Sequence, residues 1–572
     1  MKLQVVLLNL NKKGFLLYLF IILGTLFGIL YAYYMFESGL KGVYGVYDIY
    51  GPLSREPMSG IFLILSESTL FIASLLALNE NKKYYYIIIY SISLIIFLRY
   101  FWPDFSNYYY MTDFEDSFNH NFQSTYITTY GHIEPNTYSS LQPGFWLTLA
   151  EIILLIFGKT NSITSQPFYF ILKWYTAIFI IISIPIVYIT MKLYGFDDRK
   201  SSLALIVYLI ISSEYSYVVS NDYALLPYAL ASGFFIKAIK SQEKKDYLTF
   251  FILSLFAMFN HQLISLWLSF GVLGISLILL IFPQKIVTKS NVFYLLSTFI
   301  IAYLLRIIYA SGNLLQSNIT NVLSSISSGI NSLFALLRKP SSSSLITESI
   351  RALPSYALAV RIKEIDYIYL LTVPFFTLFI LSFNSKKIEY KIIFLLLIFS
   401  GAIAAFQVIG MGGVGWADRL PKDLLPLLAF SFSSIIFYDK ENLNKKKIKN
   451  IIKGFGIIFI IVGSVLSLFA TFAGYSTVAF PVSEPFGEAG IGIGITNYTA
   501  PNFNFYYYVD YGSILTENSS PSYYEYALSD FIYGVYSINP NVTYLLNNLN
   551  MVTSQSNVIL MTPTDYIFDK FK

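Results

Sequence analysis

The chain has 572 residues, of which 55% are hydrophobic and only 12% are charged, and it contains no cysteine. A soluble globular protein carries about 25% charged residues, so this composition excludes an ordinary soluble enzyme and a disordered protein. The lack of cysteine excludes a secreted domain held together by disulfides, and a net charge of +5 is too small to indicate a nucleic-acid partner. The chain is therefore predicted to be an all-α polytopic membrane protein.

Thirteen apolar stretches are predicted to cross the membrane, because a crossing helix needs about 20 mostly apolar residues. In chain order they cover residues 15–36, 59–78, 84–102, 168–191, 201–219, 222–238, 247–260, 262–282, 292–311, 367–383, 392–411, 424–438 and 452–473. The sequence therefore predicts about 13 transmembrane helices.

The distribution of charge predicts the orientation of these helices. With the N-terminus inside, 23 of the 38 Lys and Arg residues fall in cytoplasmic segments, together with only 8 of the 33 acids. Short cytoplasmic loops are rich in Lys and Arg, so this register predicts a cytoplasmic N-terminus and an external C-terminus. The expected location is the plasma membrane, with an active site that faces the exterior.

The chain divides into four predicted parts. Residues 1–102 hold the first spans and include a hairpin at 59–102, and residues 103–167 form the first large external loop. Residues 168–473 hold the other spans together with an external loop at 312–366. Residues 474–572 contain aromatic runs such as "NFNFYYYVDYGS" between Pro, Gly and Asn turns, which predicts a small extracytoplasmic α/β or mostly β domain.

The first external loop contains the densest cluster of ionisable residues, with Asp113, Glu115 and Asp116 followed by His120. Neighbouring carboxylates repel one another, which raises at least one pKa and suits a general base. Alternatively, Asp113 and Asp116 with His120 could bind a divalent cation such as Mg or Mn. A solvated loop or a helix cap near Ser117 explains the acids equally simply.

The order of features along residues 95–440 resembles the GT-C superfamily of membrane glycosyltransferases, with an architecture like protein mannosyltransferases or aminoarabinose transferases. The likeness rests on the acidic cluster, on "YGHIEP" and "LQPGFW" after it, and on "KLYGFDDRKSS" and "GWADRLPKDLLPLLAF" further on. The strict signatures, His-Pro-Pro and Trp-Trp-Asp-Tyr-Gly, are absent from these motifs.

The resemblance implies that Asp113 or Asp116 deprotonates the acceptor, with Glu115 as a rival. It also implies that Asp222, His120 and His261 line the substrate cavity. A helix cap at Asp222 and simple packing of His261 are the plainer alternatives.

For the donor phosphate, the resemblance implies Arg419 as the main ligand, because guanidinium groups bind phosphate in bidentate fashion. Lys422 is implied as an assisting cation, with Arg306 and Arg351 as secondary candidates. An ion pair of Arg419 with a neighbouring aspartate would equally account for that arginine.

The resemblance thus implies an enzyme that moves a sugar from a polyprenyl-phosphate donor to an external protein, lipid or glycan, with inversion at the sugar. No nucleic acid is expected as a partner, and membrane lipids surround the spans. A transporter or flippase of lipid-linked saccharides would share the lipid groove but need no base. A non-catalytic surface or assembly protein would tolerate replacement of the loop acids.

Overall fold

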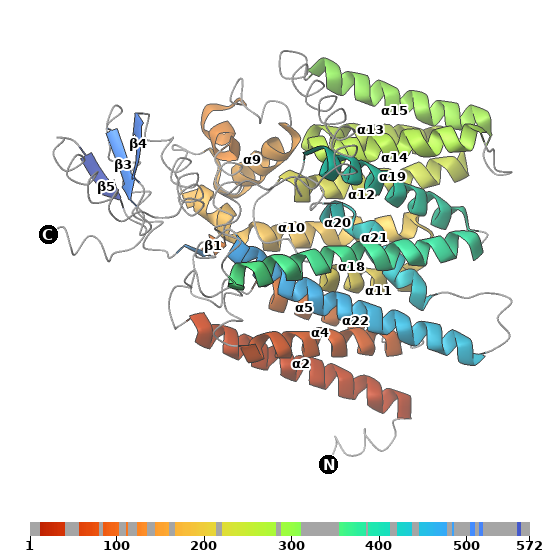
Figure 1. Ribbon diagram of the computed structural model, residues 1–572, viewed down its shortest axis with the longest axis horizontal. Coiled ribbons are helices and arrows are strands. Elements are labelled where there is room, and N and C mark those ends of the chain that lie inside the picture. Colours follow the sequence, from red (N-terminus) through yellow and green to blue (C-terminus); the bar gives the residue numbers. More distant parts are fainter. Residues whose placement is uncertain are drawn as a thin grey trace, which may run out of the picture.

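The computed structural model describes residues 12–39, 57–78, 84–101, 110–111, 123–133, 143–159, 166–212, 220–281, 288–309, 354–384, 387–411, 420–437, 446–477, 483–484, 504–508, 514–518 and 558–561. Helices dominate these residues and run side by side through one bundle (Figure 1).

The long helices follow the predicted apolar stretches. They are α2 (Lys12–Gly39), α4 (Pro57–Ala77), α5 (Tyr84–Tyr100), α10 (Gln166–Leu193), α11 (Asp198–Ile211), α12 (Ser220–Ser241), α13 (Lys244–Asn260), α14 (Gln262–Ile281), α15 (Lys289–Tyr309), α18 (Pro354–Asn384), α19 (Ile388–Met411), α21 (Leu425–Ile436) and α22 (Lys446–Thr477). Two further helices, α9 (Pro143–Phe157) and the short α20 (Leu420–Asp423), complete the set considered below.

Four segments of the described chain are long and apolar enough to cross a membrane by length and composition: Gly14–Glu37, Pro57–Ala77, Ile365–Phe383 and Asn450–Ala470. The helical character of the predicted spans is confirmed, and the chain is a helical membrane protein by these segments. That all thirteen helices cross stays a prediction. Because α18 begins at Pro354, the last part of the predicted loop 312–366 is helical instead.

Helices α11 and α21 lie in the interior of the bundle. Every residue of α11 from Ser201 to Ile211 is buried, and so is every residue of α21. A helix that is apolar on all sides is stable only when other helices surround it. The neighbours of α11 include α5, α10, α21 and α22. These surrounding helices separate α11 from lipid.

Helix α2 packs closely against α4 and α5 through two glycines. A Cβ at Gly24 would lie 2.8 Å from Leu70 Cγ, and a Cβ at Gly28 would lie 2.7 Å from Leu98 Cδ1. The Ser66 hydroxyl donates to the Gly24 carbonyl at 2.8 Å. Small residues and hydroxyl donors are the usual means by which helices associate in lipid, so the spacing of these glycines is explained by contacts inside the chain.

Ion pairs join the turns at one end of the bundle, which we call the basic end. Lys192 at the end of α10 binds Asp198 at the start of α11 at 2.6 Å, and Lys237 of α12 binds Asp246 of α13 at 2.9 Å. Lys240 of α12 binds Glu389 at the start of α19. These contacts place the ends of five helices together, as the predicted cytoplasmic loops require.

Asp197 begins α11 at this end as its N-cap, and its side chain accepts the backbone N–H of Lys200 at 2.9 Å. Partial burial alone would raise the pKa of Asp197. The N–H and ammonium of Lys200 outweigh that effect and hold the pKa below its ordinary value. The carboxylate is therefore charged at neutral pH, as its capping role requires.

The orientation can be tested with single cysteines, because the chain has no native cysteine to interfere. Lys245 at the basic end is 72% exposed, and Tyr130 in the loop predicted to be external is 55% exposed. We expect a membrane-impermeant maleimide to label Tyr130→Cys in intact cells and Lys245→Cys only after permeabilisation. Labelling of Lys245→Cys in intact cells would reverse the predicted topology.

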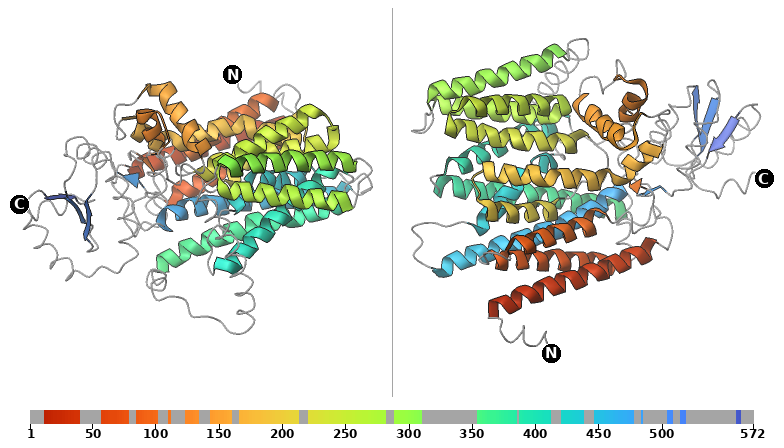
Figure 2. Two further views of the ribbon diagram at one scale, coloured as in Figure 1. Left: turned by 90° about the horizontal axis from the view of Figure 1, so that it is seen from above. Right: turned by 180° about the vertical axis from the view of Figure 1, so that it is seen from behind.

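The strands lie beyond the end of the bundle opposite the basic end (Figures 1 and 2). Strand β3 (Asn504–Tyr508) pairs antiparallel with β4 (Ile514–Asn518) and parallel with β5 (Val558–Met561). The short β1 (Tyr110–Met111) pairs with β2 (Ser483–Glu484). A mixed sheet is compatible with the small α/β or β domain that the sequence predicts for 474–572, and the existence of that domain stays a prediction.

Candidate active site

The end opposite the basic end carries α9 and the termini of several helices. Because α12 reaches the basic end at Lys240 and α13 leaves from it, α12 begins and α13 ends at the opposite end. By the same reasoning α19 leads from the basic end to α20. Helix α9 contacts both α12 and α13, and α12 contacts α20, so these termini gather into one region.

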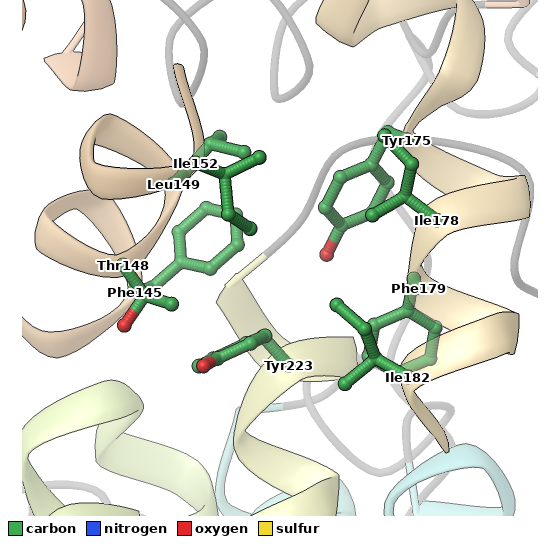
Figure 3. Close-up of a pocket in the computed structure, with 9 residues that line it drawn as sticks. All are labelled: Phe145, Thr148, Leu149, Ile152, Tyr175, Ile178, Phe179, Ile182 and Tyr223. Carbon is green, nitrogen blue, oxygen red and sulfur yellow. The ribbon is translucent and has the colours of Figure 1, made fainter. Parts of the chain in front are cut away.

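A cavity lies between α9, α10 and α12 in this region (Figure 3). It includes about 360 Å³ of space, part of it open to the outside. Its lining is almost wholly apolar and consists of Phe145, Thr148, Leu149, Ile152, Tyr175, Ile178, Phe179, Ile182 and Tyr223. Only about 20 Å³ of this space can be occupied by the centre of a water molecule, so the cavity is narrow.

Hydroxyl groups are present among the apolar walls of this cavity. Figure 3 shows the Tyr175 hydroxyl directed into the space, and it shows Tyr223 near Thr148 on the α9 side. The ring of Phe145 stands at 89° to that of Tyr175, with centroids 6.2 Å apart. The arrangement suits a hydrocarbon chain along the walls and a polar group beside the tyrosines.

The junction of α13 and α14 lies against the first turn of α9. Asn260 is fully buried, and its Nδ2 donates to the Phe256 carbonyl at 2.8 Å, whereas Oδ1 has no hydrogen-bond partner in the described part of the chain. A Cβ on Gly144 would lie 2.9 Å from this Oδ1, so glycine is needed for α9 to approach. His261 follows as the buried C-cap of α13.

Arg306 near the end of α15 donates from Nε to the Met258 carbonyl at 2.9 Å. This carbonyl lies in the last turn of α13, where backbone acceptors lack intrahelical partners and cations are favoured. Arg306 therefore caps the C-terminal end of α13. Its predicted secondary role at a donor phosphate is not tested by this contact.

Helix α20 brings two charged side chains into the protein interior. Lys422 and Asp423 are 7% and 1% exposed. Trp267 Nε1 of α14 donates to Asp423 Oδ2 at 2.7 Å. The indole therefore accounts for one oxygen of Asp423, and Lys422 is buried beside the segment that ends at Arg419.

A second buried charge cluster joins α4, α5, α11 and α22. Arg99 Nη1 donates to Glu67 Oε1 at 3.0 Å and to Oε2 at 2.9 Å, and Nη2 donates to the Ser212 carbonyl at 2.8 Å. Ser464 of α22 donates to Glu67 Oε2 at 2.8 Å. Glu67 therefore faces other helices of the bundle. The pair is fully enclosed by protein, which identifies it as a structural element.

Several predicted site residues lie outside the described residues: Asp113, Glu115, Asp116, His120, Arg351 and Arg419. For Asp222 only the backbone is described, in the first turn of α12. Lys422, Arg306 and His261 are described as above. No group of three or more metal-ligating side chains occurs among the described residues, and the predicted ligands Asp113, Asp116 and His120 are not among them.

The structure adds residues that the sequence did not indicate. Tyr175, Tyr223 and Thr148 line the cavity, but each is one of many hydroxyl-bearing residues in the chain and stands out by no local pattern. From the sequence, Asn260 can be recognised only as a polar residue beside His261 at the end of a span, and Gly144 only as a glycine in "LQPGFW". Only their contact across 116 positions of sequence shows that they belong together.

Comparison with known proteins gives a distant likeness among solved structures. No family model matches the chain, and no curated protein matches it. The crystal structure of the oligosaccharyltransferase from Archaeoglobus fulgidus in its apo form is similar, with a TM-score of 0.42 and 13% sequence identity. The match covers 74% of this chain and 59% of that protein, so the chain spans about 59% of its length. By its long apolar helices the chain is a helical membrane protein.

Proposed function

We propose that the chain is a membrane glycosyltransferase of GT-C type that uses a polyprenyl-phosphate-linked sugar at the end opposite the basic end. The observation that carries the proposal is the position of the cavity. It lies between α9, which follows the acidic loop in sequence, and the first turns of α12, which carry Asp222. A lipid-linked donor needs a binding site with apolar walls for its tail. It also needs charged groups next to those walls for its phosphate and sugar.

In this proposal the isoprenoid tail lies along Phe145, Ile178 and Ile182, and the tyrosine hydroxyls meet its polar end. Burial of each methylene contributes about 0.8 kcal/mol, so a tail segment of a few carbons binds substantially without any ion pair. The wall residues are supplied by three different helices, which makes the shape of the cavity sensitive to how α9 packs.

The reaction is a displacement at the anomeric carbon. An acceptor hydroxyl or amide of a protein, lipid or glycan attacks, and Asp113 or Asp116 removes its proton. The bond from the anomeric carbon to the phosphate oxygen breaks, and the polyprenyl phosphate leaves with inversion at the sugar. Arg419 stabilises the charge that develops on the phosphate, since fixed cations lower the energy of such a transition state. Lys422, three positions further along the chain, assists.

Filling the cavity tests where the tail binds. We expect Ile182→Trp to raise the KM for a long polyprenyl donor about tenfold. The larger side chain takes the place of about two methylene groups of the tail, and the binding free energy from their burial is lost. The matched control is Ile181→Trp, whose side chain is 53% exposed on the same helix and does not line the cavity. Transfer is measured in native membranes, which supply the acceptor.

A donor with a very short isoprenoid should be affected little by Ile182→Trp, because its tail does not reach the filled part. Equal KM values for the two variants with the long donor would reject this cavity as the tail site.

A further inference from the structure

A second cavity is a groove on the flank of the bundle between α18, α21 and α22. Its volume is about 550 Å³, and it is open along one side. Thr377, Leu381 and Ile435 are buried and form its floor, whereas Phe376 and Phe455 are more than half exposed at its edges. Apart from the threonine hydroxyls at Thr372 and Thr377, its lining is apolar.

The groove lies in the half of the bundle next to the basic end. Its α18 residues run from Thr372 to Leu381, and α18 ends at Asn384. Its α22 residues run from Ile452 to Phe459, and α22 begins at Lys446. At 1.5 Å per residue, the α18 side is about 14 Å long. One leaflet contributes about 15 Å of hydrocarbon, so the groove matches the depth of a single leaflet.

Positive charge is concentrated at the end of the groove nearest the helix termini. Helix α22 begins with "KKIKN" and has no acidic residue in its first turn. Lys453 follows directly after the groove residue Ile452 and is partly exposed. Lysines near a membrane surface attract anionic headgroups.

We propose that this groove binds an anionic phospholipid of the leaflet at the basic end, with one acyl chain between α18 and α22 and the headgroup beside Lys453. The length and apolar lining of the groove fit an acyl chain. The positive charge at its end fits an anionic headgroup. The groove lies in the other half of the bundle from the cavity at α9, so the bound lipid is separate from any sugar donor. It fills a gap between three helices and stabilises their packing.

The test uses the purified full-length protein in detergent, with phosphatidylglycerol or phosphatidylcholine added. A ligand that binds only the folded state raises the midpoint of thermal unfolding. We expect phosphatidylglycerol to raise Tm by several degrees more than phosphatidylcholine. Native mass spectrometry should show retained phosphatidylglycerol adducts on the same protein.

Two variants and their controls locate the site. Val373→Trp fills the groove and should abolish the rise with phosphatidylglycerol, whereas Phe379→Trp, on the same helix outside the groove, should keep it. Lys453→Gln should remove the preference for phosphatidylglycerol, and Lys391→Gln, an exposed lysine of α19, should not. Each variant is compared with its own Tm without lipid, so a fold defect is recognised separately.

Three outcomes would overturn the proposal. Equal shifts with both lipids would show that the site does not select charge. A normal phosphatidylglycerol shift in Val373→Trp would place the lipid elsewhere. A dimer in solution that Val373→Trp dissociates would assign the groove to a second copy of the chain.

Discussion

Replacing Asp113 and Asp116 together by asparagine is expected to lower sugar transfer from a polyprenyl-phosphate donor at least 100-fold. General base catalysis contributes about 10²–10⁴-fold, and asparagine cannot accept the acceptor's proton. The variant should reach the membrane at normal levels, because both residues lie in a loop predicted to be external. Transfer is measured with labelled donor in membranes that contain equal amounts of each protein.

The matched control for this experiment is Glu134→Gln, which removes an acid from the same predicted loop without touching the cluster. It should retain activity close to that of the wild type. Wild-type turnover in the double Asp variant would reject these residues as the base. It would favour the alternatives, a lipid-linked saccharide transporter or a surface protein, neither of which needs a base.

The second large effect is expected at the buried ion pair of Glu67 and Arg99. Both side chains are at most 3% exposed. Glu67→Gln leaves the guanidinium in the protein interior without a counter-ion, and arginine cannot lose its charge. Breaking a buried pair in this way costs about 3–5 kcal/mol. We therefore expect a markedly lower Tm and poor recovery of folded protein from membranes.

The two single variants should differ in a way that identifies the cause. In Arg99→Met the remaining Glu67 can take up a proton and become neutral, so the loss of stability should be smaller than in Glu67→Gln. The double variant Glu67→Met with Arg99→Met removes both charges and should recover much of the Tm, because apolar replacements of buried pairs are often tolerated. A larger loss in Arg99→Met than in Glu67→Gln would contradict this account.

The positions of the helices could be predicted from the sequence because long apolar stretches are a strong signal. The boundaries were less secure where charge interrupts a helix. The apolar span at Ile365–Phe383 agrees with the predicted 367–383, but α18 itself begins earlier, at Pro354, and includes the charged residues before the span. In the structure Asp366 is buried and accepts a hydrogen bond from Ser467 at 3.3 Å. A charge paired inside the bundle does not end a helix.

Contacts between distant residues could not be predicted from one sequence. Glu67 and Arg99 lie in separate apolar stretches, and Trp267 meets Asp423 across 156 positions. The cavity at α9 depends in the same way on how three helices pack, because its wall residues are ordinary apolar side chains. The acidic loop is visible in the sequence as three acids within four residues. Their role as the base follows from the resemblance to GT-C enzymes and stays a prediction, because these residues lie outside the described part of the chain.

Photo-crosslinking of a polyprenyl phosphate with a diazirine in its isoprenoid tail tests the central claim most directly. Adducts should form in the peptides that contain Phe145–Ile152 of α9 and Tyr175–Ile182 of α10, and unlabelled polyprenyl phosphate should compete them away. Adducts confined to α18 and α22, or spread over the lipid-facing helices without competition, would contradict a donor site between α9, α10 and α12.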